Sequence, residues 1–344
     1  MAIRKDQSTL SDDEKEAFVT AILALKQAPS MLHPGAPTSS RYDDYVELHV
    51  KAMMAMPDGW AHQGPAFFPW HRVLLLQFER DLQQAAQDIN LGIPYWDWTK
   101  NPALPSFLGG DGDPNKGYEV TDGPFIRDKW VFNVVDSPGA ATYLQRRFGF
   151  GDLDQNNQPI KMNLPDTAAQ DAALKIRWYD DVPWDASSPR ASSFRQSAEV
   201  DLHNRVHRWV GGFWTSDGNI ASGTMMQMTS PNDPVFWLHH ANLDRMWSAW
   251  QGLYSDRGSA PFLPQGGAAP GHNLRDSLIF GDPMPWVDTY TAAMVTDTYA
   301  LGYSYDSLQK LTATPAVTAR VMRMPVTAAF QRDPRQIFPL PSDV

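Results

Sequence analysis

Residues 62–79 read HQGPAFFPWHRVLLLQFE, residues 203–207 read HNRVH, and residues 233–244 read DPVFWLHHANLD. Together with His49, these stretches gather most of the histidines of the chain into two runs. Imidazole is a ligand for copper, zinc, iron and nickel, whereas carboxylates and carbonyls suit harder ions. Three imidazoles per ion in each run therefore predict a pair of metal sites, with copper as the favoured ion.

The spacing within the HNRVH segment agrees with this prediction. His203 and His207 are four residues apart, so on a helix their side chains lie on one face and can bind one ion together. Such a pair alone is equally typical of packed or solvated histidines, or of a zinc site. The number of neighbouring histidines favours ligation, because seven of the nine histidines lie within the two runs.

Composition narrows the class of protein. The 344 residues are 42% hydrophobic, which is enough for one large domain or for a domain with an appendage. A net charge of -10 argues against a nucleic-acid or anionic-membrane partner and favours a small neutral substrate. The chain has no cysteine, so disulfides and thiolate ligands are excluded and histidine must carry the metal chemistry.

Apolar residues recur at helical spacing in several segments. We expect His49 on a helix, His62 on a loop rich in glycine and proline, and His71 at the start of a helix. A bundle with inward-facing histidines is a common scaffold for a metal pair. The predicted fold is therefore mainly α, a four-helix bundle with long loops and a few short strands. The expected long helices span residues 11–29, 41–56, 70–89, 197–209 and 234–254.

The other segments are predicted to be less regular. Residues 99–190 are rich in Pro, Gly, Asp and Asn, which favours long loops that line a site. A short helix is expected near residues 290–301, and strand-like pieces in the tail beyond it. No apolar run approaches the roughly 20 residues of a membrane span, and the first 18 residues lack the apolar segment of a signal peptide.

The two histidine runs resemble the copper-A and copper-B signatures of tyrosinases, catechol oxidases and hemocyanins, the type 3 dicopper proteins. Residues 62–79 fit the first signature across their length, and residues 233–244 fit the second without a gap. The resemblance covers roughly residues 40–255. Position by position it implies two copper ions, with these ligands: His49, His62 and His71 for copper A, and His203, His207 and His240 for copper B.

Two adjacent histidines compete for the last ligand position. In the family the ligand stands seven residues after the Asp of the Asp-Pro pair and four before the next Asp, which is His240 here. His239 then has a supporting role or packs nearby. His33 and His272 lie in Pro/Gly-rich loops and match no ligand position, so we expect them at the surface.

The resemblance also implies an activity. Type 3 copper oxidases use dioxygen as a co-substrate, and a tyrosinase converts monophenols to o-diphenols and o-diphenols to o-quinones. The alternatives are an oxidase restricted to o-diphenols or o-aminophenols, a hemocyanin-like oxygen carrier, and a zinc-bound or structural histidine cluster. Without a cysteine, the thioether crosslink to a copper-A histidine found in many members is impossible, and in this the chain resembles bacterial tyrosinases.

Residues beside the ligands bear on the choice between these reactions. In tyrosinases an Asn directly after the first copper-B histidine, with a nearby Glu, holds a water that deprotonates the monophenol. Asn204 occupies that position here and favours hydroxylation. Glu199 is the nearest upstream acid, but it stands only four residues before His203, so it is either the water-holding Glu or an ordinary glutamate of the first helical turn.

Other candidates concern the pocket and its surroundings. Arg208 would lie at the pocket mouth, where it draws in a substrate carboxylate or faces solvent. Met225 and Met228 occupy the family's gate position and either pack over an aromatic substrate or fill the core. Glu79 and Asp244 are expected either to support the ligand helices or to form ion pairs with a neighbouring arginine.

The end of the chain suggests a division at about residue 306. Tyr303-Ser304-Tyr305 resembles the tyrosine motif that closes the catalytic domain of larger family members. We therefore expect a catalytic domain in residues 1–306 and, in residues 307–344, a short extension that forms a strand pair or a lid. Some bacterial tyrosinases leave the cell with a small copper-delivering partner protein, so the compartment stays open between cytoplasm and export with a partner.

Overall fold

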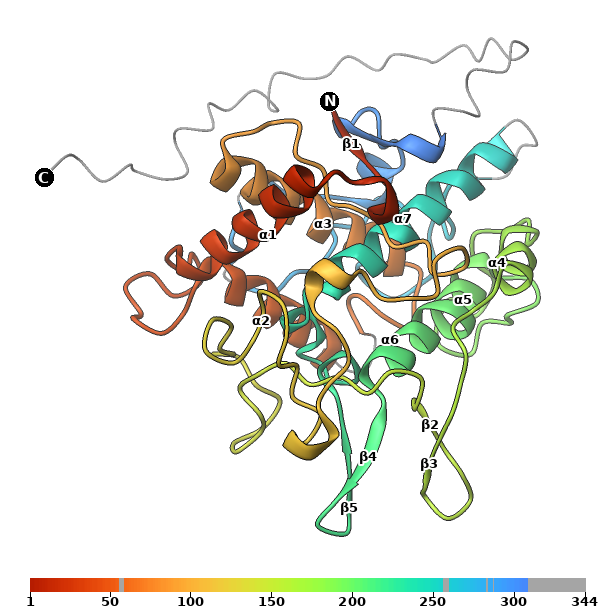
Figure 1. Ribbon diagram of the computed structural model, residues 1–344. Coiled ribbons are helices and arrows are strands. Elements are labelled where there is room, and N and C mark those ends of the chain that lie inside the picture. Colours follow the sequence, from red (N-terminus) through yellow and green to blue (C-terminus); the bar gives the residue numbers. More distant parts are fainter. Residues whose placement is uncertain (56–58, 256–259, 283, 287, 309–344) are drawn as a thin grey trace, which may run out of the picture.

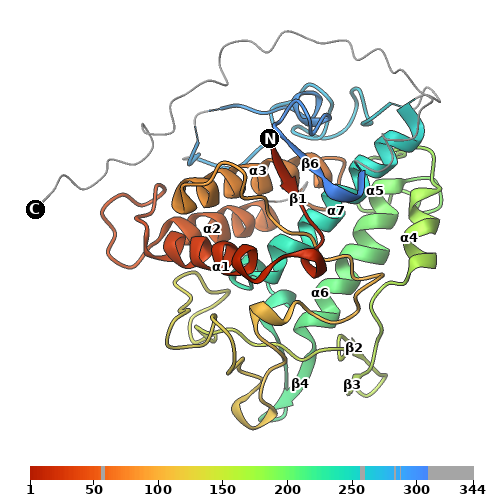
Figure 2. The same ribbon diagram turned by 45° about the horizontal axis from the view of Figure 1, so that its top comes forward.

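The fold is mainly helical, as predicted, and its helices meet around the last long helix, α7 (Figures 1 and 2). Helices α1, α2 and α3 lie side by side on one flank of α7, and α4, α5 and α6 lie on the other. The computed structural model describes residues 1–55, 59–255, 260–282, 284–286 and 288–308.

Helices α1 (Asp12–Gln27) and α2 (Arg41–Met54) begin where the sequence provides caps. Ser11 and Ser40 each accept from the backbone N–H three residues on and form reciprocal capping boxes. Such boxes satisfy two of the N–H groups that a helix start leaves unpaired. The predicted starts of both helices are therefore confirmed, and α2 places His49 in the interior.

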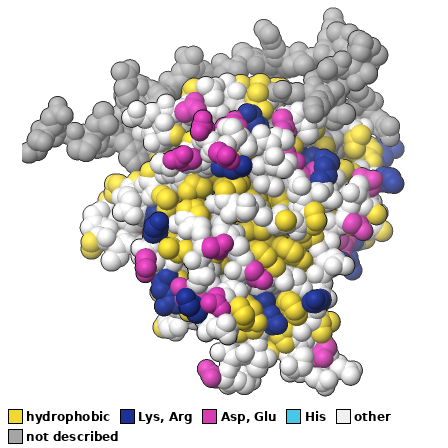
Figure 3. All heavy atoms as spheres, in the orientation of Figure 1, with side chains coloured by type: hydrophobic (Ala, Val, Ile, Leu, Met, Phe, Trp, Pro, Cys, Tyr) yellow, Lys and Arg dark blue, Asp and Glu magenta, His cyan; other side chains and the backbone are white. Residues whose placement is uncertain are grey.

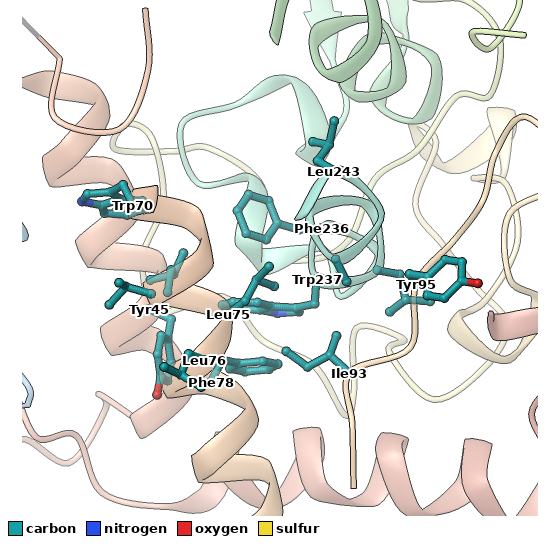
Figure 4. Close-up of a cluster of buried hydrophobic side chains, with 14 of the residues drawn as sticks. Tyr45, Trp70, Leu75, Leu76, Phe78, Ile93, Tyr95, Phe236, Trp237 and Leu243 are labelled. Carbon is teal, nitrogen blue, oxygen red and sulfur yellow. The ribbon is translucent and has the colours of Figure 1, made fainter. Parts of the chain in front are cut away.

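Helices α3 (Phe67–Ala86) and α7 (Val235–Tyr254) form the centre of the molecule. Both are buried over most of their length, and their buried faces include charged residues such as Arg72 and Asp244 as well as apolar ones. The rings of Phe78 and Trp237 stack at 3.6 Å where the two helices cross (Figure 4). This contact holds the helices that carry His71 and His240 in register.

The predicted helix over residues 197–209 has three parts rather than one. It begins as α5 (Phe194–Ser197), widens into the π-helix η4 (Ala198–His203) and continues as α6 (Asn204–Gly211). The widened turn is closed by the bond from the Asn204 N–H to the Glu199 carbonyl. Single π-helical turns are rare and commonly occur at functional sites. Here the turn ends at His203, one of the predicted metal ligands.

Short strands occur in three pairs. The parallel pair β1 (Ala2–Arg4) and β6 (Tyr303–Tyr305) joins the two ends of the described chain, with Ala2 opposite Tyr303. The other pairs are antiparallel and project together from one end of the molecule (Figure 1). These hairpins are formed by β2 (Asp152–Leu153) with β3 (Pro159–Ile160), and by β4 (Phe213–Ser216) with β5 (Asn219–Ser222).

Two expectations about minor elements were wrong. The region predicted to consist of loops contains a helix, α4 (Thr167–Leu174), which begins at the Asp166 cap. The short helix expected near residues 290–301 is reduced to one 3₁₀ turn. The 3₁₀ turns of the described chain are η1 (Gln7–Thr9), η2 (Ser106–Leu108), η3 (Pro114–Lys116), η5 (Thr224–Met226), η6 (Ser230–Asn232) and η8 (Ala292–Val295).

The surface agrees with the acidic composition. On the face in Figure 3, Lys and Arg side chains are scattered among Asp and Glu and do not gather into a basic patch. Within the part of the chain that the structure describes, no helix is long and apolar enough to cross a membrane. The extension expected over residues 307–344 lies almost wholly outside the described residues, and so does its predicted role as strand pair or lid.

Candidate metal centre

The predicted ligands converge into two adjacent clusters in the core. In each cluster the potential ligand atoms lie within 4.8 Å of one another. The clusters face each other, because the rings of His71 and His240 are 4.3 Å apart and those of His62 and His203 are 5.4 Å apart. One cluster contains His49, His62 and His71, and the other contains His203, His207, His239 and His240.

Most of the ligand rings are oriented through the nitrogen that faces away from the centre. Backbone carbonyls accept from Nδ1 of three histidines at 2.7 Å, and a side-chain oxygen accepts from the fourth at 2.8 Å. A proton on Nδ1 leaves Nε2 with a lone pair, which is the arrangement a metal ligand needs. The pairs are His49 with Met228, His71 with Phe67, His207 with Met225, and His203 with Asn204 Oδ1.

The ring nitrogens that point into the centre have no hydrogen-bond partners among the described residues that would account for their burial. Nε2 of His49, His71 and His203 is buried without a hydrogen bond to any described residue. Nε2 of His207 and Nε2 of His240 face each other at 3.4 Å. Burying polar atoms without partners costs free energy. The convergence of these nitrogens therefore points to a bound metal ion, which accepts their lone pairs. An all-imidazole donor set fits copper.

The protonation state of the rings also fits a metal site. Burial lowers the pKa of His49 and of His207 to about 4. Burial likewise lowers the pKa of the other rings in the two clusters well below the usual value for histidine. The rings are therefore neutral at pH 7, with lone pairs available for a metal.

His272 corrects an expectation drawn from the sequence. It is 3% exposed rather than a surface residue, and it holds both ends of the loop that carries His62. Its Nε2 donates to the Gly59 carbonyl at 2.9 Å, and its Nδ1 accepts from the Ala66 N–H at 3.2 Å. Nothing in its sequence surroundings marks this role, because its partners are backbone groups about 200 residues away. His33 is exposed, as expected.

His239 lies beside the predicted copper-B ligands His203 and His207. It is fully buried, and its ring stacks on that of His203 at 5.4 Å. Its Nδ1 accepts from the indole N–H of Trp98 at 3.2 Å, a contact that the sequence did not indicate. Burial lowers the pKa of His239. The backbone carbonyl of His203, which is an acceptor, partly offsets this effect by raising the pKa.

Glu199 lies in the π-helix η4, which ends at His203, and Asn204 directly follows it. Glu199 is buried, accepts from the Gln63 N–H at 2.7 Å and pairs with Arg195 at 3.1 Å. Burial raises the pKa of its carboxyl, although Arg195 acts to lower it. Gln63 follows the predicted ligand His62, so this carboxylate links the π-helix to the loop that carries His62. Glu199 does lie in the first turn of η4, but it is buried and paired with Arg195.

The pocket candidates lie nearby but are engaged by protein groups. Arg208 donates to the Gly151 carbonyl at 2.8 Å and pairs with Asp152, and its side chain is 40% exposed. The Met225 side chain is buried, and that of Met228 is partly buried. Both methionines contribute backbone carbonyls to histidines of the clusters, so their loop positions one histidine in each cluster.

Glu79 on α3 and Asp244 on α7 belong to a buried ion-pair network. Asp244 accepts from Arg72 at 2.5 Å, as expected from the sequence, and also from Arg4 at 3.1 Å. Glu79 pairs with Arg4 at 2.8 Å rather than with its neighbour Arg80. The hydroxyl groups of the tyrosine motif donate to Asp244 as well. The network therefore joins α3 and α7 to both strands of the β1–β6 pair.

Sequence comparison agrees with the geometry. A family model described as the common central domain of tyrosinase matches residues 39–253. A tyrosinase from Streptomyces antibioticus is 37% identical over 314 residues, which cover 87% of this chain and 97% of that protein. Grixazone synthase from Streptomyces griseus is 32% identical over 346 residues, with 88% and 99% coverage.

A solved structure shows the same fold. The polyphenol oxidase from Thermothelomyces thermophila superposes with a TM-score of 0.62 at 23% identity, covering 89% of this chain and 88% of that one. The family match spans every histidine of the two clusters, and the relatives span most of the chain. The chain therefore belongs to the tyrosinase family, whose members hold a pair of copper ions.

Proposed function

We propose that the protein is a phenol oxidase that hydroxylates monophenols to o-diphenols and oxidises o-diphenols to o-quinones, with dioxygen as co-substrate. The observation that carries this proposal is the convergence of buried, neutral imidazoles with unpartnered inward nitrogens. A copper pair bound there supplies the redox chemistry with dioxygen, which no protein side chain offers. Its ligands would be His49, His62 and His71 on one side and His203, His207 and His240 on the other.

Hydroxylation of a monophenol also needs a group that removes the phenolic proton. A phenol with a pKa near 10 is almost entirely neutral at pH 7, so a positioned base has a defined task. We assign this task to Glu199, acting through a water held by Asn204. Burial raises the pKa of Glu199, which makes its carboxylate a stronger base. The Asn204 oxygen accepts from His203 Nδ1, and its amide N–H groups have no partner among the described residues.

Two substitutions at Asn204 separate its roles. Asn204→Asp keeps an oxygen for His203 but removes the amide donor, whereas Asn204→Ala removes both. We expect Asn204→Asp to lower monophenol turnover on the order of 100-fold while diphenol turnover changes little. Asn204→Ala should reduce both activities, because His203 also loses its partner. Equal losses of the two activities in Asn204→Asp would contradict the water-holding role.

A second candidate is an oxidase restricted to o-diphenols or o-aminophenols. The observation in its favour is that both carboxylate oxygens of Glu199 are already engaged, one by the Gln63 N–H and one by Arg195. A carboxylate held in this way is less able to accept a proton from water. Family membership alone does not choose between the reactions, because grixazone synthase is a relative as well as the tyrosinases.

Oxygen uptake distinguishes the two candidates. The copper-loaded protein is given a p-alkyl monophenol with a trace of catechol, and then catechol alone in excess. Sustained uptake with the monophenol is the result expected from a tyrosinase. Rapid uptake with catechol but none with the monophenol would replace the first candidate by the second. No uptake with either substrate would overturn both.

The remaining assignments concern substrate entry and copper supply. We propose that Arg208 receives a substrate carboxylate by exchanging its half-exposed ion pair with Asp152. Met225 and Met228 are proposed to line the approach to copper B, with Met228 the more accessible of the two. We also propose a catalytic domain over residues 1–306, a short extension over residues 307–344, and a copper-delivering partner protein.

A further inference from the structure

Four imidazoles surround the copper-B position, although three are needed. A ring nitrogen of His239 lies within 4.8 Å of the ligand atoms of His203, His207 and His240, and the ring is fully buried. By distance alone, His239 is as much a candidate ligand as the other three. A fourth imidazole would fill the coordination position that a catalytic copper keeps open for its substrates. Some feature of this chain must therefore keep His239 from binding.

Trp98 provides that feature. An indole N–H can only donate, so the contact of Trp98 Nε1 with His239 Nδ1 at 3.2 Å requires an unprotonated Nδ1. A neutral imidazole carries one N–H, which must then be on Nε2. The lone pair of Nδ1 is used by Trp98, and Nε2 has no lone pair. Neither nitrogen can coordinate a metal, whichever of them is nearer to it.

The ligand histidines have the opposite tautomer. In His203 and His207, Nδ1 donates to an oxygen, so Nε2 is the unprotonated nitrogen. In His239, by contrast, Nδ1 meets a donor instead of an acceptor. Trp98 itself is 1% exposed, and its backbone N–H donates to the Trp96 carbonyl at 3.0 Å, so the indole is held in place.

We propose that Trp98 is a positioning residue that fixes His239 in the Nε2–H tautomer and thereby excludes it from copper B, so that this copper keeps three imidazole ligands and an open position. The proposal rests on the dicopper centre and not on the choice between the two oxidase reactions. Replacing Trp98 by Phe preserves an aromatic ring but removes the N–H. His239 can then take the other tautomer and offer a lone pair to the metal.

The tautomer can be read directly in the metal-free wild-type protein. Two-bond ¹H–¹⁵N spectra of ¹⁵N-histidine-labelled protein distinguish protonated from unprotonated ring nitrogens, and comparison with His239→Phe assigns the signals. We expect Nδ1 of His239 to be unprotonated and Nε2 to be protonated. The reverse tautomer would overturn the proposal. This measurement needs no Trp98 variant, so it decides the question even if that variant does not fold.

Ligand counting tests the consequence. X-ray absorption of the Cu(I)-loaded protein should show three nitrogen ligands per copper in the wild type and an average above three in Trp98→Phe. The double variant Trp98→Phe/His239→Phe should return to three. Trp96→Phe is the matched control, because it removes an indole N–H that donates to the Asn101 carbonyl instead. An unchanged count in folded Trp98→Phe protein, or an increase that persists in the double variant, would overturn the proposal.

Discussion

His272 shows how a single residue can serve a metal centre without binding the metal. It holds the backbone at Gly59 and Ala66, on both sides of the loop that carries His62. The ring also packs on Gly64, where an added Cβ would lie 2.5 Å from His272 Cε1. Any side chain at position 64 would therefore displace either the ring or the loop. His62 is a loop ligand whose position depends on a contact distant in sequence.

We expect His272→Ala to weaken copper A selectively. Without its two bonds the His62 loop is less constrained, and loss of such supporting contacts typically costs about 10- to 100-fold in metal affinity. The bonds of His272 to Gly59 and Ala66 both hold the loop that carries His62, so copper B should be weakened less than copper A. Competition with a Cu(I) chelator measures both constants. His33→Ala, at an exposed histidine, is the control, and equal weakening of the two sites would contradict the expected selectivity.

The convergence of the histidines was predictable from the sequence, but the orientation of their rings was not. The choice of His240 over His239 stays a prediction, which rests on the fixed distances of the family ligand to two aspartates. The groups that orient the rings are mostly backbone carbonyls, such as those of Met225 and Met228. Every residue has a carbonyl, so residue type carries no signal for this role. The contact of Trp98 with His239 was missed because it joins residues 141 positions apart.

Among the elements, the π-helix η4 differs most from the prediction. Residues 197–209 contain no breaker, and side-chain periodicity does not distinguish a single wide turn from an α-helical one. The wide turn persists because tertiary contacts stabilise it, in particular the bond from the Gln63 N–H to Glu199. A few short strands were predicted, but the hairpins β2–β3 and β4–β5 were not located, since two- to four-residue strands carry too little pattern to recognise.

The loop that follows β5 offers a test at the same scale. Gly223 precedes η5, and a Cβ there would lie 2.3 Å from the Gly211 carbonyl oxygen and 2.6 Å from that of Gln145. Both are backbone atoms, so Gly223→Ala must shift the loop that orients His49 and His207. We expect about 1–3 kcal/mol of destabilisation and weaker copper binding at both sites.

Thermal unfolding and chelator competition check this prediction. The matched control is Gly252→Ala in α7, where an added Cβ meets nothing within 4 Å. In a helix this change should stabilise by about 0.5–1 kcal/mol. Unchanged copper affinity in Gly223→Ala would show that the loop does not orient the ligands.

At the scale of the whole molecule, the β1–β6 strand pair joins the two ends of the described chain. The buried guanidinium of Arg4 contacts Glu79 and Asp244, and it lies 3.7 Å from the centre of the Tyr303 ring. The first strand therefore closes the same network as the tyrosine motif 300 residues later. The sequence indicated the motif but not its partner, because pairing over such a distance leaves no local pattern.

Protonation links the metal centre to the stability of the whole apoprotein. The pKa of His49 and of His207 is about 4 in the folded state, against about 6.5 in an unfolded chain. As pH falls below 6.5, these histidines bind protons in the unfolded state but stay unprotonated in the folded state. The free energy of unfolding therefore decreases until about pH 4. From pH 7 to pH 5 these two residues alone should cost about 4 kcal/mol.

Urea unfolding of the metal-free protein at several pH values measures this dependence. Bound copper should raise the free energy of unfolding at each pH, because it binds only the folded state. It should not remove the loss towards pH 5, because the protons are taken up by the unfolded chain. Equal stability of the apoprotein at pH 7 and pH 5 would contradict the prediction.

The carbonyls of Met225 and Met228 lie three residues apart in one loop, yet they orient histidines of different clusters, which we propose to bind different metal ions. Occupancy of one position therefore pre-orders the loop for the other, so the second ion should bind more tightly than the first. Copper loading becomes cooperative, and half-loaded molecules, which could not carry out a two-electron reaction, stay scarce. A copper titration followed by native mass spectrometry should show mainly empty and doubly loaded protein, with little of the singly loaded form.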